Sequence, residues 1–197
     1  MIRRTLVAGT LGFVALTCWT VVLNVLFGFT VRVAMNRVAD EAVVHRVLKE
    51  NITAPGVYLV NPALTREWQY PAGEPVFGVT YSGMGHEAAG PMMPVEVGLA
   101  FAGALLVAGL LSAASASVLS TWVRRTGFVI AVGVLLAVTA DLSRVGIGGY
   151  PMGVAASKAA GRVAGWSLAG LAMAWATRPP ATEPGRSSQR DRRHRSP

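Results

Sequence analysis

The sequence predicts an all-α membrane protein with four transmembrane helices and a small α+β extracytoplasmic segment between helices 1 and 2. Of the 197 residues, 52% are hydrophobic and only 14% are charged, whereas soluble domains carry about 25% charged residues. A helix that crosses a bilayer needs roughly 20 mostly apolar residues, and its backbone groups must bond internally. Four apolar stretches meet this description, at about 5–30, 95–118, 127–142 and 153–177.

The first stretch follows Arg3 and Arg4, a positive start that is also typical of a signal peptide. Its apolar part continues for about 25 residues, whereas the core of a signal peptide has 7–15. We therefore expect residues 1–35 to form a retained signal-anchor helix. A cleaved precursor is the alternative.

Residues 36–94 form the segment between the first two stretches. A one-sided helix is predicted near 40–51, because Val43, Val44, Val47 and Leu48 fall on one face. A Pro-Gly turn then leads to a short strand at 57–60, and the stretch PVFGVTYSG is typical of a second strand. Since an isolated hairpin is only marginally stable in water, we expect this segment to pack on the outer ends of the helices.

The loop GMGHEAAGPMMP, residues 83–94, brings potential copper ligands close together in the sequence. Thioether and imidazole groups suit Cu(I), and the candidate ligands are Met84, His86, Met92 and Met93. The simpler interpretation is that Gly-Pro and Met-Pro mark the entry to helix 2, with Pro94 in its first turn. We therefore expect no cofactor, and copper at these four residues is the alternative.

Ionisable residues within membrane spans are functional candidates by default. Asp141 and Arg162 each lie 16 residues from a basic residue at the far end of their stretch, which places both about 24 Å along a helix. This matching depth predicts an ion pair of Asp141 with Arg162 or Lys158 that fixes the register of helices 3 and 4. The alternative is a proton or anion site at the outer mouth of the bundle. The full set is Glu96, Asp141, Arg144, Lys158 and Arg162.

The fourth stretch carries small residues at strict four-residue spacing, which allows a neighbouring backbone to approach closely. Its partner is either another helix of this chain or a second protein, and the sequence leaves both open. The row consists of Gly153, Ser157, Gly161, Gly165 and Ala169.

Basic residues indicate the orientation. With four spans, Arg3 and Arg4, the pair Arg124 and Arg125, and the tail 178–197 all fall on one side. Positive loops stay in the cytoplasm, so both termini are predicted to be cytoplasmic and residues 36–94 extracytoplasmic, in a bacterial inner membrane. The tail is rich in Pro, Ser and Arg, which predicts disorder and contact with anionic lipid headgroups. It has no aromatic residues for base stacking, so nucleic acid is not an expected partner.

Sequence motifs of common enzymes are missing. The chain has no P-loop, HExxH or GxSxG motif, and its three histidines lie outside the apolar stretches, where they do not suit a membrane haem. We expect a non-catalytic accessory, assembly or envelope-interaction protein that acts through its outer segment and through helix packing with a membrane partner or a second copy. Copper or small-solute handling at the outer mouth is the alternative.

Two stretches carry a resemblance. The sequence MNRVADEAVVHRVLKENITAPGVYLVNP, together with the later GGYPMGV and AGRVAGWSLAGLAMAW, resembles an uncharacterised group of small bacterial four-helix inner-membrane proteins with a Pro-Gly-Val-Tyr outer segment. The resemblance implies a four-helix architecture with one outer segment. It implies no activity.

Overall fold

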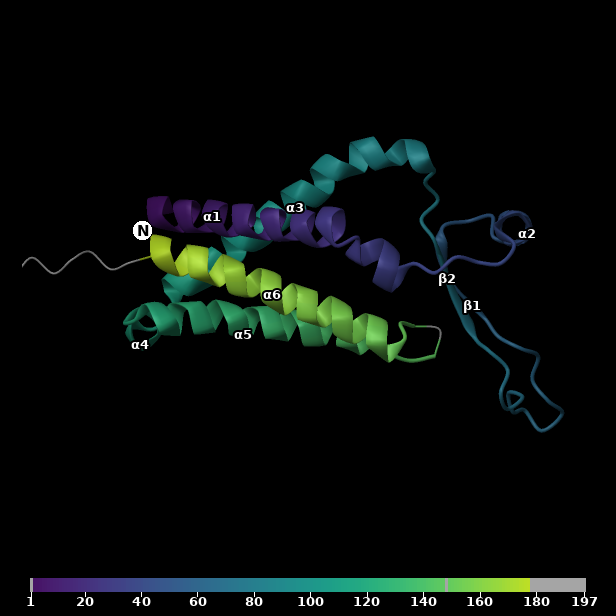
Figure 1. Cartoon of the computed structure of the whole chain (residues 1–197). Coiled ribbons are helices and arrows are strands. Elements are labelled where there is room, and N and C mark those ends of the chain that lie inside the picture. Colours follow the sequence, from purple (N-terminus) through teal and green to yellow (C-terminus); the bar gives the residue numbers. More distant parts are fainter. Residues whose placement is uncertain (1, 148, 178–197) are drawn as a thin grey trace, which may run out of the picture.

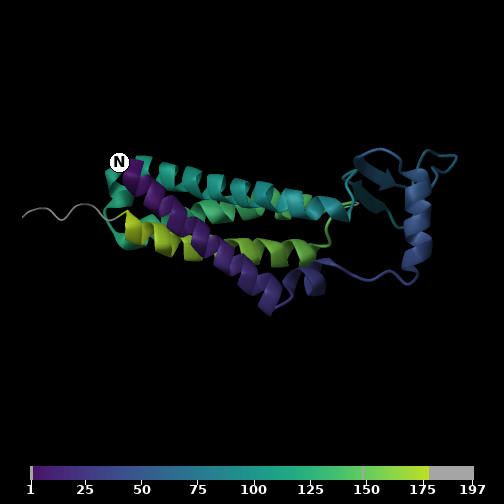
Figure 2. The same ribbon diagram turned by 90° about the horizontal axis from the view of Figure 1, so that it is seen from above.

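The computed structural model describes residues 2–147 and 149–177, so the predicted properties of the tail lie outside the described residues. The fold is mostly helical, with 69% helix and one small two-stranded sheet. This confirms the prediction of a helical protein with a small α+β segment. Long helices lie alongside one another in a bundle, and α2 and the hairpin lie beyond one end of it (Figures 1 and 2). The elements are α1 (Ile2–Val21), α2 (Glu41–Asn51), β1 (Gly56–Val60), β2 (Phe77–Tyr81), α3 (Ala89–Ala113), α4 (Ala116–Leu119), α5 (Trp122–Ala140) and α6 (Met152–Ala176).

Among the described residues, three helical segments are long and apolar enough to cross a membrane: Ile2–Leu26, Ala89–Ala113 and Trp122–Arg144. The first extends α1 by a π-helical turn, and the third extends α5 by a 3₁₀ turn. Helix α6 has 25 residues, as many as α3, but it is not one of the three. Its glycines, its serines and two cations make it less hydropathic than these three segments.

Two helices begin earlier than the apolar pattern predicts. Helix α3 starts at Ala89, so Pro91 lies in its first turn and Pro94 lies inside the helix. The first-turn N–H groups have no partner within the helix, so a proline there removes no hydrogen bond. Helix α5 starts at Trp122, where the Thr121 hydroxyl accepts a hydrogen bond from the Arg124 N–H at 3.3 Å.

Helix α1 ends in a break rather than continuing to residue 30. The π-helical turn 22–26 is followed by Gly28, whose φ of +58° lies in the left-handed region that favours glycine. A second short π-helical turn, Thr30–Ala34, then leads out of the bundle. The chain therefore changes direction at Gly28.

Helix α6 lies between α1 and α5 and packs on both through glycines. A Cβ atom added at Gly133 of α5 would come within 2.5 Å of Trp166, and one added at Gly165 of α6 within 2.7 Å of Trp19 on α1. The buried core lies mainly in the half of the bundle near the N-terminus. It comprises Ala8, Ala104, Val107, Ala108, Leu111, Val129, Trp166, Ala169 and Met173.

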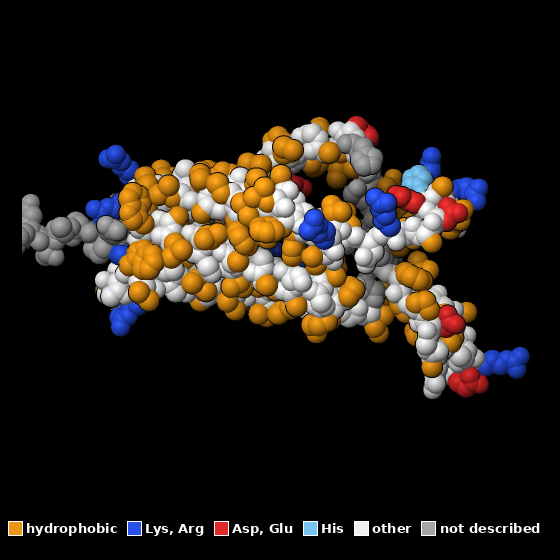
Figure 3. Space-filling view, in the orientation of Figure 1, with side chains coloured by type: hydrophobic (Ala, Val, Ile, Leu, Met, Phe, Trp, Pro, Cys, Tyr) orange, Lys and Arg blue, Asp and Glu red, His pale blue; other side chains and the backbone are white. Residues whose placement is uncertain are grey.

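The start of α1, the turn around α4 and the last residues of α6 lie at one end of the bundle, here called the N-terminal end (Figure 1). The opposite end, which carries α2 and the strands, is called the hairpin end. Between the two ends, apolar side chains cover much of the face shown in Figure 3.

Arg125 was expected to be an ordinary basic loop residue, but only 4% of its surface is exposed to solvent. Its guanidinium donates to the backbone carbonyls of Leu119 at 3.2 Å and Thr177 at 3.4 Å.

The segment between α1 and α3 contains the predicted helix and ribbon. Asp40 accepts a hydrogen bond from the Val43 N–H at 3.0 Å and caps α2, while β1 and β2 pair antiparallel from Gly56 opposite Tyr81 to Val60 opposite Phe77. The expectation that this segment packs on the helix ends is wrong. Instead, α2 faces the hairpin across a groove of about 590 Å³ that includes Leu48, Ile52 and Val79, and the whole segment lies clear of the bundle (Figure 2).

Candidate functional site

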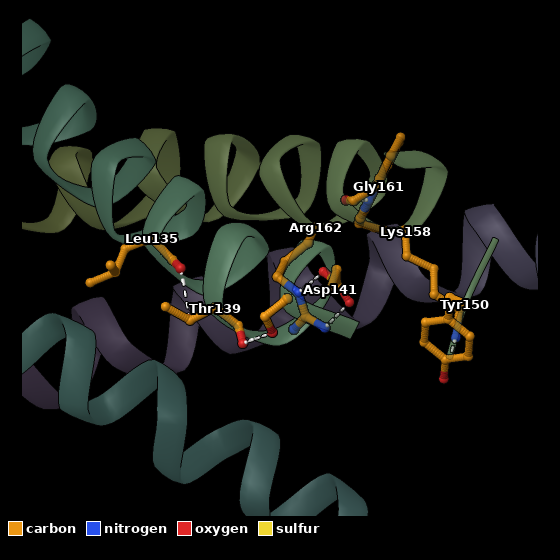
Figure 4. Close-up of polar contacts among 9 residues, drawn as sticks. Leu135, Thr139, Asp141, Tyr150, Lys158, Gly161 and Arg162 are labelled. Carbon is orange, nitrogen blue, oxygen red and sulfur yellow. Dashed lines mark hydrogen bonds and ion pairs between the residues drawn. The ribbon is translucent and has the colours of Figure 1, made fainter. Parts of the chain in front are cut away.

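An ion pair joins α5 and α6 at the hairpin end of the bundle (Figure 4). Arg162 donates from Nε to Asp141 Oδ2 at 2.5 Å and from Nη2 to Oδ1 at 3.0 Å. Asp141 is the C-terminal cap residue of α5 and is 4% exposed. Bidentate pairing to a carboxylate is geometrically specific, so the pair holds the two helices in one alignment. Among the described residues it is the only ion pair.

Lys158 lies one helical turn from Arg162 and points instead to Tyr150 in the α5–α6 connection (Figure 4). Its Nζ atom donates to the Tyr150 hydroxyl at 3.3 Å and lies 4.4 Å from the ring centroid. Arg144 approaches the same ring, with Cζ 6.0 Å from the centroid. The hydrogen bond from Lys158, followed by the contact with Arg144, lowers the pKa of Tyr150 below its usual value.

A glycine notch on α6 receives Trp19 of α1. The indole Nε1 donates to the carbonyl of Gly161 at 2.8 Å, and the lack of a side chain at Gly165 leaves space for the ring. The indole N–H, a donor that usually finds a partner when buried, is therefore satisfied by the neighbouring helix.

Polar side chains also follow the end of α1. Asn24 donates from Nδ2 to the Thr20 carbonyl at 2.9 Å, and the Thr30 hydroxyl donates to Asn24 Oδ1. These bonds tie the turn after α1 to the segment beyond Gly28 and provide internal partners for polar groups at the end of an apolar helix.

Most of these residues, but neither Arg144 nor Tyr150, border a groove of about 520 Å³ between α1, α3 and α6. Its polar side carries Asp141, Lys158 and Arg162, and the facing walls include Leu16, Leu23, Leu99 and Gly103. The lining contains one carboxylate and two cations, which leaves one net positive charge. The groove exists because α3 diverges from the other helices toward the hairpin end (Figure 1), where all its residues from 89 to 100 are exposed.

The structure brings together only part of the predicted set of charged residues. Arg144 lies over Tyr150 rather than against Asp141. Glu96 is an exposed residue of α3 and forms no ion pair with any described residue. The ionic contact is therefore confined to Asp141 and Arg162.

The predicted row of small residues on α6 is used in part for packing within the chain. Gly161 and Gly165 face Leu23 and Trp19 of α1, and Ala169 is buried. Ser157 is half-buried. At Gly153, by contrast, an added Cβ would meet nothing within 4 Å, so close packing involves only the part of the row nearer the N-terminal end.

The predicted copper ligands lie in three successive segments of the chain. Met84 follows β2, His86 begins the 3₁₀ turn 86–88, and Met92 and Met93 are exposed on α3. The side chain of His86 is outside the described part of the structure, so copper binding stays a prediction. Within the described part, no group of three or more His, Cys, Asp or Glu side chains is placed to hold a metal ion.

Sequence reasoning missed Trp19, Asn24 and the buried position of Arg125. A signal for Trp19 is present, because an indole in the first apolar stretch needs a partner and the small-residue row offers a place for it. Asn24 is likewise a polar residue within an apolar stretch. Arg125 gives no such signal, since two adjacent arginines after a span are the usual mark of a cytoplasmic loop.

No protein-family model matches this chain, and comparisons with curated proteins and with solved structures find no match.

Proposed function

We propose that this chain is a four-span protein of the bacterial inner membrane with a non-catalytic, accessory role, and that its outer segment docks a partner protein. The observation that carries the docking role is Trp68, which is 83% exposed in the long loop of the hairpin.

Helix α6 supports a fourth span through its length and packing. Its 25 residues correspond to about 37 Å of helix, enough for a hydrocarbon core of about 30 Å. Its two cations sit toward the hairpin end, where Asp141 neutralises Arg162 and where a lysine can extend toward the headgroups. The half nearer the N-terminal end is free of charge up to Thr177.

The charge distribution supports the orientation. Arg3, Arg4 and Arg124 belong to the N-terminal end of the bundle, and Arg125 caps helix ends there. Positively charged connections stay in the cytoplasm, so this end is assigned to the cytoplasm and the hairpin end to the outside. The outer segment from 36 to 93 has four basic and six acidic residues, as suits a translocated segment.

Trp68 is presented by an ordered turn. The Thr65 N–H donates to the Gln69 carbonyl at 2.8 Å, and the Trp68 N–H donates to the Thr65 carbonyl at 3.1 Å. Trp68 has a φ of 61°, the only positive value among the described non-glycine residues. A bulky residue in this conformation is strained, and such strain persists mostly at functional positions. Tryptophan is also enriched among residues that dominate the binding energy of interfaces.

A second apolar surface lies on α2. Val43, Val44 and Val47 are exposed and do not line the groove between α2 and the hairpin, and α2 has no buried residue. The hairpin loop points away from the helix ends (Figure 1), which favours a partner in the aqueous phase over insertion of this loop into the bilayer.

The test is quantitative co-purification from native membranes in a mild detergent, with Trp68→Ala compared with the wild-type chain. We expect a stoichiometric protein partner with the wild-type chain and its loss with Trp68→Ala. Gln69→Ala is the matched control, because Gln69 is the exposed neighbour whose turn contacts are made by its backbone. The proposal fails if the chain purifies alone and binds Cu(I) tightly, or if Trp68→Ala retains the partner in full.

A further inference from the structure

We infer that the groove between α1, α3 and α6 binds one anionic phospholipid, with the phosphate at Lys158 and Arg162 and an acyl chain along the apolar walls. The inference rests on the proposed membrane placement of α6. It does not depend on the docking role of the outer segment, because neither Trp68 nor the exposed valines of α2 line this groove.

The groove holds a positive charge that its own residues leave unbalanced. Arg162 engages Asp141 with Nε and Nη2, while its Nη1 donates to no described residue and its side chain is 39% exposed. Lys158 has three donors and, among the described residues, uses one, on Tyr150. Unsatisfied charged donors are costly within a membrane, and phosphate oxygens accept charge-assisted hydrogen bonds.

The two cations lie at the depth of a lipid headgroup. Arg162 is about 21 Å along α6 from the last residue of the helix, Ala176, and Lys158 is about 6 Å nearer the hairpin end. With a hydrocarbon core of about 30 Å, Lys158 lies within about 3 Å of its outer boundary. A phosphate placed between the two cations would therefore sit where phospholipids carry it.

The shape and access of the groove favour a lipid over a free anion. The residues of α6 that line the groove run from Lys158 past Gly161 to Gly165, a length of about 10 Å. Leu16 and Gly103 form its apolar side walls. The surface is hollowed where α3 diverges (Figure 3). Since α3 is exposed on all sides from 89 to 100, the open side would face lipid tails, which an acyl chain enters without leaving hydrocarbon.

The experiment uses the full chain in detergent, with bound lipid counted by native mass spectrometry. Phosphatidylglycerol is compared with phosphatidylcholine of identical acyl chains, and inorganic phosphate is added in a third arm. We expect one phosphatidylglycerol per chain in preference to phosphatidylcholine. Lys158→Gln should weaken this binding about fivefold, the effect of one basic residue near a lipid surface, and Lys158→Arg should retain it.

Arg144→Gln is the matched control, because it removes the same charge at the same end of the bundle from a residue that does not line the groove. It should bind phosphatidylglycerol like the wild-type chain. Equal binding of the two lipids, or equal loss in Lys158→Gln and Arg144→Gln, overturns the inference. So does displacement of lipid by inorganic phosphate, which would indicate a free-anion site, or a lipid-free dimer, which would indicate that a second copy fills the groove.

A second readout tests the acyl chain. Trp19 lines the groove, so phosphatidylglycerol with brominated chains should quench its fluorescence more than brominated phosphatidylcholine at equal mole fraction. The difference between the wild-type chain and Trp19→Phe isolates this signal from the other tryptophans. Equal quenching by both lipids would contradict a specific site.

Discussion

Arg162 of α6 and Asp141 at the end of α5 meet through two hydrogen bonds, from Nε at 2.5 Å and from Nη2 at 3.0 Å. The carboxylate is almost fully buried, while the guanidinium keeps one edge on the groove. The same pair can therefore align two helices and leave donors available for a ligand.

Removal of the carboxylate should destabilise the bundle. Asp141→Asn leaves Arg162 without its counter-charge, and we expect the free energy of unfolding in detergent to fall by about 2 kcal/mol, between the values for exposed and buried pairs. Thermal unfolding of the purified chain measures this. Glu96→Gln is the control, because Glu96 is exposed and forms no ion pair with a described residue. Equal stability of Asp141→Asn and the wild-type chain would refute a structural role for the pair.

The close contact between Gly165 and Trp19 leads to a second prediction. Gly165→Ala places a Cβ atom 2.7 Å from Trp19 Cδ1, so the indole must move and its hydrogen bond to Gly161 is weakened. Overpacking of this kind costs about 1–3 kcal/mol. Gly153→Ala, in the same row but with open space around it, should change stability by no more than about 0.5 kcal/mol. Similar melting temperatures for the two variants would show that α1 does not pack on α6 as described.

The pKa of Tyr150 should depend on Lys158. The hydrogen bond from Lys158 lowers the pKa of Tyr150, so Lys158→Gln should raise it. Because the folded pKa lies below the unfolded value, Tyr150 adds stability that is complete above the unfolded pKa and is lost as pH falls through the folded pKa. Near-ultraviolet absorbance of the phenolate follows the titration, and subtraction of the Tyr150→Phe curve isolates this residue. An unchanged curve in Lys158→Gln would exclude the contact.

Local patterns in the sequence predict much of this fold. Asp40 caps a one-sided helix, the Pro-Gly turn at 55–56 precedes a strand, and the apolar stretches become helices. The matching depth of Asp141 and Arg162 along their helices predicts an ion pair of Asp141 with Arg162 or Lys158. In the structure the partner is Arg162. Such features depend on spacing along one or two elements, which the sequence displays directly.

The remaining features depend on how distant elements meet. The groove arises because α3 leans away from the bundle, and no local pattern in α3 indicates a tilt. Trp19 opposite Gly161 and Arg125 on the carbonyl of Thr177 are contacts across 142 and 52 residues. The outer segment lies off the helix ends because α2 faces its own hairpin. Hydrophobic periodicity does not indicate which element α2 packs against.

The most direct test of the account is the side of the membrane on which the C-terminus lies. In a Cys18→Ser background, Gln69→Cys reports on the hairpin loop and Ser196→Cys on the tail. With four spans, a membrane-impermeant thiol reagent applied to intact spheroplasts should label Gln69→Cys, and it should label Ser196→Cys only after lysis. If α6 does not cross the membrane, the three remaining spans leave the C-terminus outside. Labelling of Ser196→Cys in intact spheroplasts would therefore contradict the four-span account.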